Sequence, residues 1–522
     1  MSSEQFEKNT RTNTLLTLAS RITGLVRDGA MSRVFGAGSF ASAFYFAFLI
    51  PNLFRRLFGE GALAAAFLPA YSKLHYENEA HARAFATLTL STLTLFLTGI
   101  VIALELILLA TLSVQEEPRL AIQLTMVMLP YMPLVCIVAI LAAMLHVHGK
   151  FGPPAAAPII LNGAMIGATV GFIHFFDSES KHMYSIAMAV VFAGIIQVIW
   201  SLLALRRVGW FSSETSIVRG ELRKLMRTTL PMIVGLGVLQ INTLCDGLIA
   251  SWATLFGDSI FGIAYPLDES AMSELSFGQR LYQFPLGVFG IAIATAIYPL
   301  LAKQHQDEAC FSETMRRGLR SVMFIGLPAS AGLLLIREPL TAAVFQGGAF
   351  TSEDTLSVGA ILLGYAPAVW AFSMCGVLTK GFYARGNTMT PVRIAIGCML
   401  LNAALNVTLI WTPLNTAGLA WSTSVCAVLQ AALLMSFISK EAKPFDGAVF
   451  VSWLKASVLT VVMSAVVAYL LQLEFFHTSS WEGSLQTLAI IVPAATLIYG
   501  CGALLLRMPE FKWALGLKSE KV

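Results

Sequence analysis

SRITGLVRDGAMSRVFGAGSFASAFYFAFLIPNLFRRLFGEGALAAAFLPAYSK, residues 20–73, places five arginines in two neighbouring apolar runs. These are Arg21, Arg27 and Arg33 in the first run and Arg55 and Arg56 in the second. An ionised side chain at membrane depth costs roughly 2.5–3.5 kcal/mol on insertion scales. A chain that bears this cost repeatedly uses the charges, and the use that we expect is to hold an anion inside the membrane.

The composition predicts an all-α polytopic membrane protein. Of the 522 residues, 57% are hydrophobic and only 12% are charged, whereas soluble domains are about 25% charged. The apolar runs are continuous and about twenty residues long, as spanning helices require, while the strands of outer-membrane barrels alternate with period two. The polar N-terminus shows no signal-peptide pattern, so we expect no removable leader. Seven scattered cysteines without a CxxC pair suggest neither a disulfide framework nor a metal site.

We expect about fourteen transmembrane helices, one for each apolar run. The runs are 14–35, 40–71, 87–112, 120–145, 155–172, 183–205, 228–256, 277–301, 318–336, 356–379, 392–411, 417–438, 449–471 and 485–506.

The placement of lysine and arginine predicts the orientation of these helices. With the N-terminus in the cytoplasm, the loops on the opposite side hold only Arg119, Lys181 and Arg337 of the 34 basic residues. Six arginines lie inside helices, namely the five named above and Arg280, and the rest fall at the termini or in cytoplasmic loops. Because cytoplasmic loops are enriched in basic residues, both termini are predicted to be cytoplasmic.

A weak internal repeat predicts two related halves. ALAAAFLPAYSK (62–73) matches AIATAIYPLLAK (292–303) at three alanines, the proline and the lysine. A period of six helices is even, so the halves would insert in parallel around an axis along the membrane normal, with a site at their interface. The last two helices fall outside the repeat.

The intramembrane cations are all arginine, which favours a phosphate ligand. A guanidinium binds phosphate oxygens bidentately and stays charged at any pH. Arg280 stands just before Pro285, and Pro51 precedes Arg55 and Arg56 in a helix where it is expected to cause a kink. In the alternative interpretation, the arginines anchor helices at the interface or are neutralised. The acids available for neutralisation are Asp28, Glu60 and Asp246.

Asp246 is the acid of its helix and lies one turn from Asn242. Such a carboxylate can bind Na⁺, take up a proton, or pair with an arginine. The residues leave ion coupling and structural pairing open.

Several segments resemble the MurJ/MviN family, the lipid II flippases of the MOP superfamily. They are GLVRDGAMSRVFGAG (24–38), FAFLIPNLFRRLFGEGALAAAFLPAYSK (46–73), GPPAAAPIILN (152–162), RLYQFPLGV (280–288), REPLTAAVFQGGAFTSEDT (337–355), GFYARGNTMTPVRIAI (381–396) and NTAGLAWSTS (415–424).

The resemblance implies a fold of two six-helix lobes around a central cationic cavity, residues 1–222 and 223–442. Residues 443–522 would add two helices that form a groove for a polyprenyl tail and a cytoplasmic C-terminus. The resemblance also implies a set of substrate-binding residues, which are the arginines that match those of the family and two neighbouring residues. It comprises Arg21, Arg27, Arg55, Arg280, Gly24 and Glu60.

The chain departs from the family pattern at two positions. Ser42 stands in ASAFYFAF where many members have an acid, and Gln283 stands where some have glutamate, which puts any gating role of those carboxylates in doubt. Some members bind Na⁺ through an acid and polar groups, and the nearest positions here are Asp246, Asn402, Asn406 and Thr423. The second carboxylate of that site is an amide here, so a Na⁺ or H⁺ coupling ion is an expectation only.

The resemblance implies alternating access by a monomer in the bacterial inner membrane. The cargo would be lipid II, an undecaprenyl-diphosphate-linked muropeptide, flipped to the outer leaflet, with the membrane potential as driving force and cell-wall synthesis enzymes as partners. No cofactor is expected, and no GxxxxGK[ST] motif is present.

The alternative functions are a flippase for another polyprenyl-linked oligosaccharide, a drug exporter, and a membrane transferase. A transferase needs clustered acids for Mg²⁺, and the intramembrane acids here are single.

Overall fold

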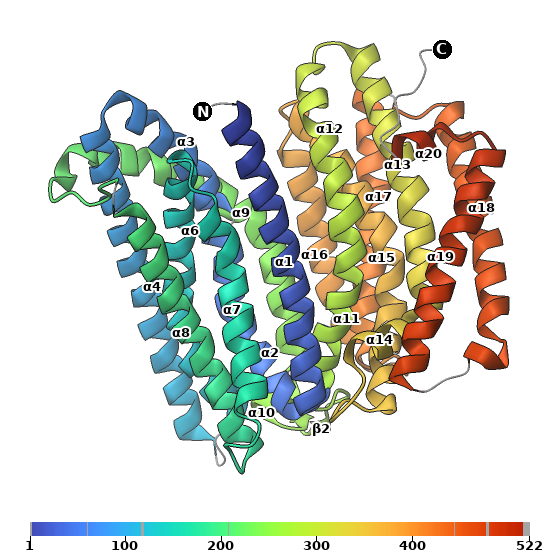
Figure 1. Cartoon of the computed structure of the whole chain (residues 1–522), viewed down its shortest axis with the longest axis horizontal. Coiled ribbons are helices and arrows are strands. Elements are labelled where there is room, and N and C mark those ends of the chain that lie inside the picture. The colour runs from blue at the N-terminus through green and yellow to red at the C-terminus, as the bar shows by residue number, and fades with distance from the viewer. Residues whose placement is uncertain are drawn as a thin grey trace. The chain divides into compact units, whose positions relative to one another are not determined.

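The computed structural model describes residues 3–59, 61–115, 119–206, 208–442, 444–476 and 480–514. Long helices dominate it (Figure 1). The first part of the chain forms α1 Ser3–Phe35, α2 Ser39–Phe54, η1 Arg55–Gly59, α3 Ala62–Glu77, α4 Glu79–Val114, α5 Leu120–Met128, α6 Tyr131–Val147, α7 Gly152–Gly171, α8 Glu179–Leu205, η2 Thr215–Val218, α9 Arg219–Ala250, α10 Trp252–Phe256, β1 Ser259–Ile260 and β2 Ile263–Ala264. The remainder forms α11 Ala271–Pro285, η3 Leu286–Gly290, α12 Ile291–Lys303, α13 Glu308–Leu335, α14 Arg337–Phe345, α15 Ser352–Ala384, α16 Met389–Leu409, α17 Ala417–Ala442, α18 Gly447–Leu471, η4 Glu474–Phe476, α19 Trp481–Leu505 and α20 Pro509–Ala514.

The chain divides into two compact units, Met1–Ser273 and Glu274–Val522. In the first unit α1 packs along α7, as Figure 1 shows, and α2 packs on α5 while α6 packs on α8. Large buried aromatic side chains fill the contacts between its helices; for example, the ring centroids of Phe67 and Phe85 lie 5.4 Å apart. This unit positions the arginines of α1 and η1.

The second unit is built around α15, which packs against α12, α13 and α17. Buried side chains such as Phe311, Met315 and Phe382 form the core between these helices. At the edge of the unit, α18 and α19 lie side by side, drawn in red in Figure 1, and α18 packs on α13. The predicted final pair of helices is therefore present and packs on this unit.

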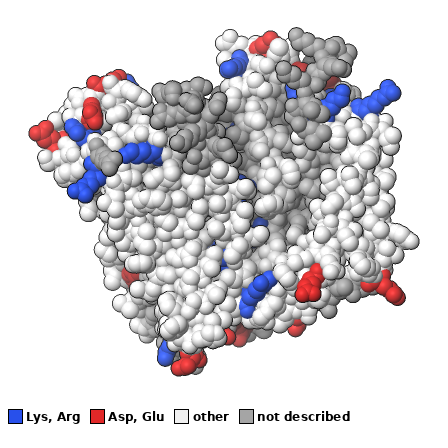
Figure 2. Space-filling view, in the orientation of Figure 1, with Lys and Arg blue, Asp and Glu red and all other residues white. Residues whose placement is uncertain are grey.

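The fold is the all-α polytopic class that the composition predicts. Helices cover all fourteen predicted runs, and eleven spans among the described residues are long and apolar enough to cross a membrane. The runs that do not reach these criteria are covered by α1, by α2 with α3, and by α9. α1 carries three of the arginines, and α2 and α3 are short helices separated by η1. Charges in the first case and the interruption in the second shorten the continuous apolar stretch. In Figure 2 the charged side chains gather at the ends of the helices, and the band between is almost uncharged.

Two predicted helices are interrupted by π-helical turns. The predicted run 40–71 is divided into α2, η1 and α3, and the run 277–301 into α11, η3 and α12. Each π-helical turn lies just before one of the two matched segments of the internal repeat, which supports that repeat. Proline lacks the backbone donor that an α-helix needs, and Pro51 and Pro285 stand shortly before the two turns.

Several elements were not expected from the sequence. The run 120–145 is split at Leu129 and Pro130 into α5 and α6, and the loop after α9 contains α10 and a short antiparallel hairpin. A further short helix, α14, follows α13. The division into units falls after Ser273, later than the predicted lobe boundary at residue 222, and the three predicted domain ranges stay a prediction.

Candidate functional site

Arg27 and Asp28 form an ion pair inside the first unit. Both the Nε and the Nη2 of Arg27 donate to the Oδ1 of Asp28, at 2.9 and 2.7 Å. Arg27 is 6% exposed and Asp28 is 2% exposed. The sequence indicated Asp28 only as one of the acids that could neutralise an arginine, and the structure pairs it with Arg27. Asp28, one of the acids expected to neutralise arginines, therefore balances the charge of Arg27, one of the expected substrate ligands.

Asn162 of α7 completes the surroundings of Arg27. Its Oδ1 accepts from the Nη1 of Arg27 at 3.1 Å, and the guanidinium also lies over the ring of Phe48, 5.8 Å from its centroid. Neither residue was singled out from the sequence. The available signal was a lone amide in the apolar segment GPPAAAPIILN.

The other predicted arginines are more open. Arg21, Arg33, Arg56 and Arg280 are exposed, and Arg55 is half-buried. The Nε of Arg55 donates to the Oδ1 of Asn52 at 3.1 Å, which orients the side chain along the end of α2. Arg280 lies on α11 in the second unit. Exposed guanidinium groups on apolar helices are suited to a soluble or lipid-linked anion.

The two remaining members of the predicted binding set have different outcomes. Gly24 is half-buried on α1, and a Cβ there would meet the Nδ2 of Asn162 at 3.6 Å, an ordinary contact distance. A methyl group would therefore fit at this position, and the contact between α1 and α7 does not require glycine. Glu60 lies outside the described residues.

Ser42, at a position where the resemblance implies an acid, has a backbone hydrogen-bond partner. Its Oγ accepts from the backbone N–H of Ser273 at 3.0 Å, and Ser42 is 0% exposed. Ser273 in turn donates from its Oγ to the carbonyl of Ala37 at 2.7 Å. These bonds join the start of α2 to the start of α11. Gln283 is half-buried on α11.

Asp246 is buried on α9, 5% exposed, and accepts from the Nδ2 of Asn242 at 3.2 Å. The next residue, Gly247, faces Leu49 of α2 so closely that a Cβ would overlap its side chain. α9 and α2 therefore approach each other closely at the residue that follows Asp246.

Two of the polar residues predicted for ion coupling, Asn402 and Asn406, are joined by a hydrogen bond in the second unit. Asn402 donates to the Oγ of Ser422 at 3.2 Å, and Asn406 donates to the Oδ1 of Asn402 at 3.1 Å. Ser422, which was not predicted, donates to the Oδ1 of Asn406. Thr423 donates to the carbonyl of Leu419 in its own helix at 2.9 Å.

Sodium binding by this cluster stays a prediction. Its side chains are neutral and buried, and their oxygens accept hydrogen bonds from one another. Within the described residues, no group of three or more His, Cys, Asp or Glu side chains is arranged to hold a metal ion.

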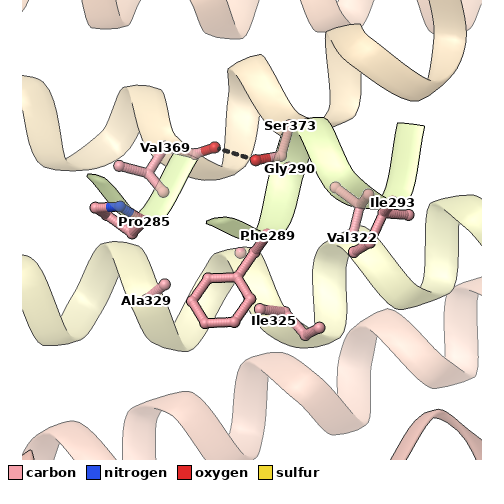
Figure 3. A pocket seen from close by; sticks show the side chains of 10 residues that line it. Pro285, Phe289, Gly290, Ile293, Val322, Ile325, Ala329, Val369 and Ser373 are labelled. Carbon is pink, nitrogen blue, oxygen red and sulfur yellow. Dashed lines mark hydrogen bonds between the residues drawn. The ribbon is translucent and has the colours of Figure 1, made fainter. Parts of the chain in front are cut away.

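The cavity in Figure 3 is not a cargo site. It lies between η3, α13 and α15 and is lined by apolar side chains, with Ser373 as the polar exception. Its volume is about 10 Å³, which is about enough for one water molecule. Gly290 is required there, because a Cβ would lie 2.9 Å from the Cβ of Ser373.

The comparisons with known proteins decide the family. The family model described as "Lipid II flippase MurJ" matches residues 31–488. The chain belongs to this lipid II flippase MurJ family. Among relatives, "Probable lipid II flippase MurJ" of Vibrio cholerae is 34% identical over 443 residues, covering 80% of each chain. "Lipid II flippase MurJ" of Burkholderia cenocepacia is 28% identical over 521 residues, covering 95% of this chain and 96% of the relative.

Solved structures agree on the fold. "Lipid II flippase MurJ, inward closed conformation" superposes with a TM-score of 0.77 at 22% identity, covering 95% of this chain and 99% of the other. An inward-facing multidrug resistance MATE family transporter of the MOP superfamily gives a TM-score of 0.64 at 13% identity, covering 82% and 98%. Membership in the MurJ family, with eleven apolar spans, makes the chain a multi-pass bacterial inner-membrane protein of a transporter family.

Proposed function

We propose that this chain flips lipid II from the cytoplasmic to the outer leaflet. The observation that carries the proposal is the match of the MurJ family model to residues 31–488, together with relatives that carry the lipid II flippase name. The alternative cargo is another oligosaccharide linked to a polyprenyl diphosphate, which would offer the same diphosphate. The MATE likeness concerns the fold alone, and no observation favours drug export.

The arginines are the proposed diphosphate ligands. Arg21 and Arg27 lie on α1, Arg55 begins η1, and Arg280 lies on α11. A guanidinium fork binds two phosphate oxygens at once. Moving a bare diphosphate through hydrocarbon would cost tens of kcal/mol, so a cation must accompany it. Gly24 and Glu60 belong to the same proposed binding set.

Alternating access is the proposed mechanism. The site opens to the cytoplasm, takes up the head group, closes, and reopens outward while the polyprenyl tail stays in the bilayer. The tail would lie along α18 and α19, whose outer faces carry exposed apolar residues such as Val458, Val461 and Leu497. Both termini would lie in the cytoplasm.

The membrane potential is the proposed driving force. An inside-negative potential contributes about 2.3 kcal/mol per charge per 100 mV, so export of a diphosphate is favoured by up to about twice that if the arginines stay fixed. Asp246 is the acid at which a coupling ion would bind, and of the two expected ions, Na⁺ and H⁺, we propose H⁺. No step uses ATP, and we propose that the protein acts as a monomer that supplies the cell-wall synthesis enzymes.

Depletion and complementation test this function. Cells depleted of their own flippase accumulate lipid II inside, and this chain should restore lipid II that an externally added degrading enzyme can reach. An inserted, folded chain that restores none would contradict the proposal. Restored export of a different polyprenyl-linked sugar in a matched strain, without lipid II, would favour the alternative cargo.

A further inference from the structure

Asn162 is a polar residue on an apolar helix, and it is 5% exposed. Two sides of its amide are used. The Oδ1 faces the Nη1 of Arg27 at 3.1 Å, and the Nδ2 lies 3.1 Å from the Oγ1 of Thr23 and 3.2 Å from the carbonyl of Ser20. A guanidinium only donates and a carbonyl only accepts, so these partners fix the orientation of the amide. Asn162 therefore joins the Arg27 side chain to the backbone of α1 one to two turns earlier.

The guanidinium of Arg27 is already hydrogen-bonded to protein groups in this structure. Its Nε and Nη2 bind Asp28, its Nη1 binds Asn162, and the residue is 6% exposed. The same N–H groups are the ones with which an arginine grips a phosphate bidentately. Binding of an anionic head group by Arg27 must therefore replace contacts with Asp28 and Asn162.

We propose that Asn162 is a positioning residue that sets how readily Arg27 leaves Asp28 for the anionic head group; this rests on the proposed function, in which Arg27 is a ligand of the diphosphate. Asp28 supplies the charge, but it is on the same helix as Arg27 and moves with it. Asn162 lies on α7, so it relates the position of the guanidinium to a second helix.

Arginine labelling tests this role without any transport. The full-length protein in lipid bilayers is treated with phenylglyoxal, and the modification of Arg27 is quantified by peptide mass spectrometry. Asn162→Leu should raise the labelling rate of Arg27 about tenfold, which corresponds to about 1.4 kcal/mol for one lost hydrogen bond to a charged group. Arg21 and Arg33, exposed on the same helix, should label as in the wild type and serve as internal references.

Two further variants keep the test sharp. Thr169→Val changes another buried α7 residue that faces α1, since its Oγ1 donates to the Sδ of Met31 at 3.2 Å, and it should leave Arg27 labelling unchanged. Asn162→Asp keeps the acceptor for Arg27 and adds charge, so it should label no faster than the wild type. An unchanged ratio of Arg27 to Arg33 labelling in Asn162→Leu, or a tenfold rise in Asn162→Asp, would overturn the inference.

A second arm separates this inference from the proposed function. Purified lipid II is added to the Asn162→Leu protein, and it should protect Arg27 from phenylglyoxal. If labelling rises in the variant but lipid II gives no protection, Asn162 holds Arg27 and the diphosphate role of Arg27 is wrong. If labelling does not rise, the positioning role fails whatever lipid II does.

Discussion

Arg27 and Asp28 are consecutive residues of α1, and the Nη2 of Arg27 lies 2.7 Å from the Oδ1 of Asp28. Consecutive helix residues do not face each other, so the pair forms because the long arginine side chain folds back onto its neighbour. Both side chains are buried, with 8% and 3% exposure. The charge of Arg27 is thereby balanced within one turn of helix.

This pair should behave as a unit when it is mutated. Removing one partner of a buried pair leaves the other charge exposed to a low dielectric and costs about 3–5 kcal/mol. We expect Arg27→Met and Asp28→Asn each to lower the thermal stability of the purified protein strongly, and the double variant to lower it by much less than the sum. Strictly additive losses in a double-mutant cycle would show that the two side chains do not interact.

Ser42→Ala should destabilise the protein, although it removes only the side-chain oxygen of one residue. The backbone N–H of Ser273 would lose its acceptor in a buried position, at a cost of about 1–3 kcal/mol. Ser436→Ala is the control, because Ser436 is exposed and returns its hydroxyl only to the carbonyl of Ala432. Equal melting temperatures for the two variants would contradict the role given to Ser42.

The last short helix should hold α18 in place. Glu510 is 1% exposed and accepts from the Nε of Arg320 on α13 at 2.5 Å and from the Oγ of Ser452 on α18 at 2.6 Å. Glu510→Ala should therefore cost several kcal/mol and speed hydrogen exchange in the first turns of α18. Glu221→Ala breaks the exposed pair with Lys224 and should change stability by less than about 1 kcal/mol. Unchanged exchange in α18 after Glu510→Ala would refute this.

Stability should fall on mild acidification because of His148. Burial lowers the pKa of His148, the nearby His75 and Lys150 lower it further, and Glu79 opposes them. The Nε2 of His148 lies 3.0 Å from the Oη of Tyr71. Because the folded state disfavours the charged imidazole, the unfolded chain takes up a proton that the folded one does not as the pH falls through about 6.5. This contribution is present above that pH and is lost below it.

His148→Gln should flatten that dependence. The melting temperature of the wild type is followed between pH 7.5 and 5.5, and the variant should lose less stability over this interval. An identical pH profile for the two proteins would assign the acid sensitivity to other groups.

Export should be insensitive to sodium. The neutral cluster of Asn402, Asn406 and Ser422 is already hydrogen-bonded internally, so it offers no charge to a bound cation. We expect replacement of Na⁺ by K⁺ at constant membrane potential to change the export rate by less than about twofold, while collapse of the potential slows it as charge movement requires. A sodium-dependent rate that Asp246→Asn abolishes would establish sodium coupling instead.

Physical regularities explain which parts of the structure were predictable. Helices are visible in the sequence because apolar length and the basic-residue bias are properties of single segments, and the all-α class and the helix positions were predicted correctly. The π-helical turns η1 and η3 were only indicated by Pro51 and Pro285, since a proline marks a break but not its geometry.

The site was harder to predict because its contacts are long-range. The sequence offered Asp28 as one of three acids that could neutralise an arginine, and only the structure shows that the long Arg27 side chain reaches it. Asn162 lies more than a hundred residues from Arg27 in sequence, and no local pattern reports such a contact. From the sequence, Ser42 was notable only as a serine at a position where the resemblance implies an acid. The structure shows that it accepts a hydrogen bond from the backbone of Ser273 on α11.

The central claim is that the intramembrane arginines carry the cargo. The most direct measurement is the amount of lipid II accessible at the outer face of depleted cells that express Arg21→Ala, Arg27→Ala, Arg55→Ala or Arg280→Ala. Arg33→Ala serves as the control at an exposed arginine outside the binding set, and membrane levels of every variant are quantified. Our account predicts that variants which insert normally at the binding set lose export at least tenfold, while Arg33→Ala restores it. Full export by all four binding-set variants would show that these charges are structural and that the proposed mechanism is wrong.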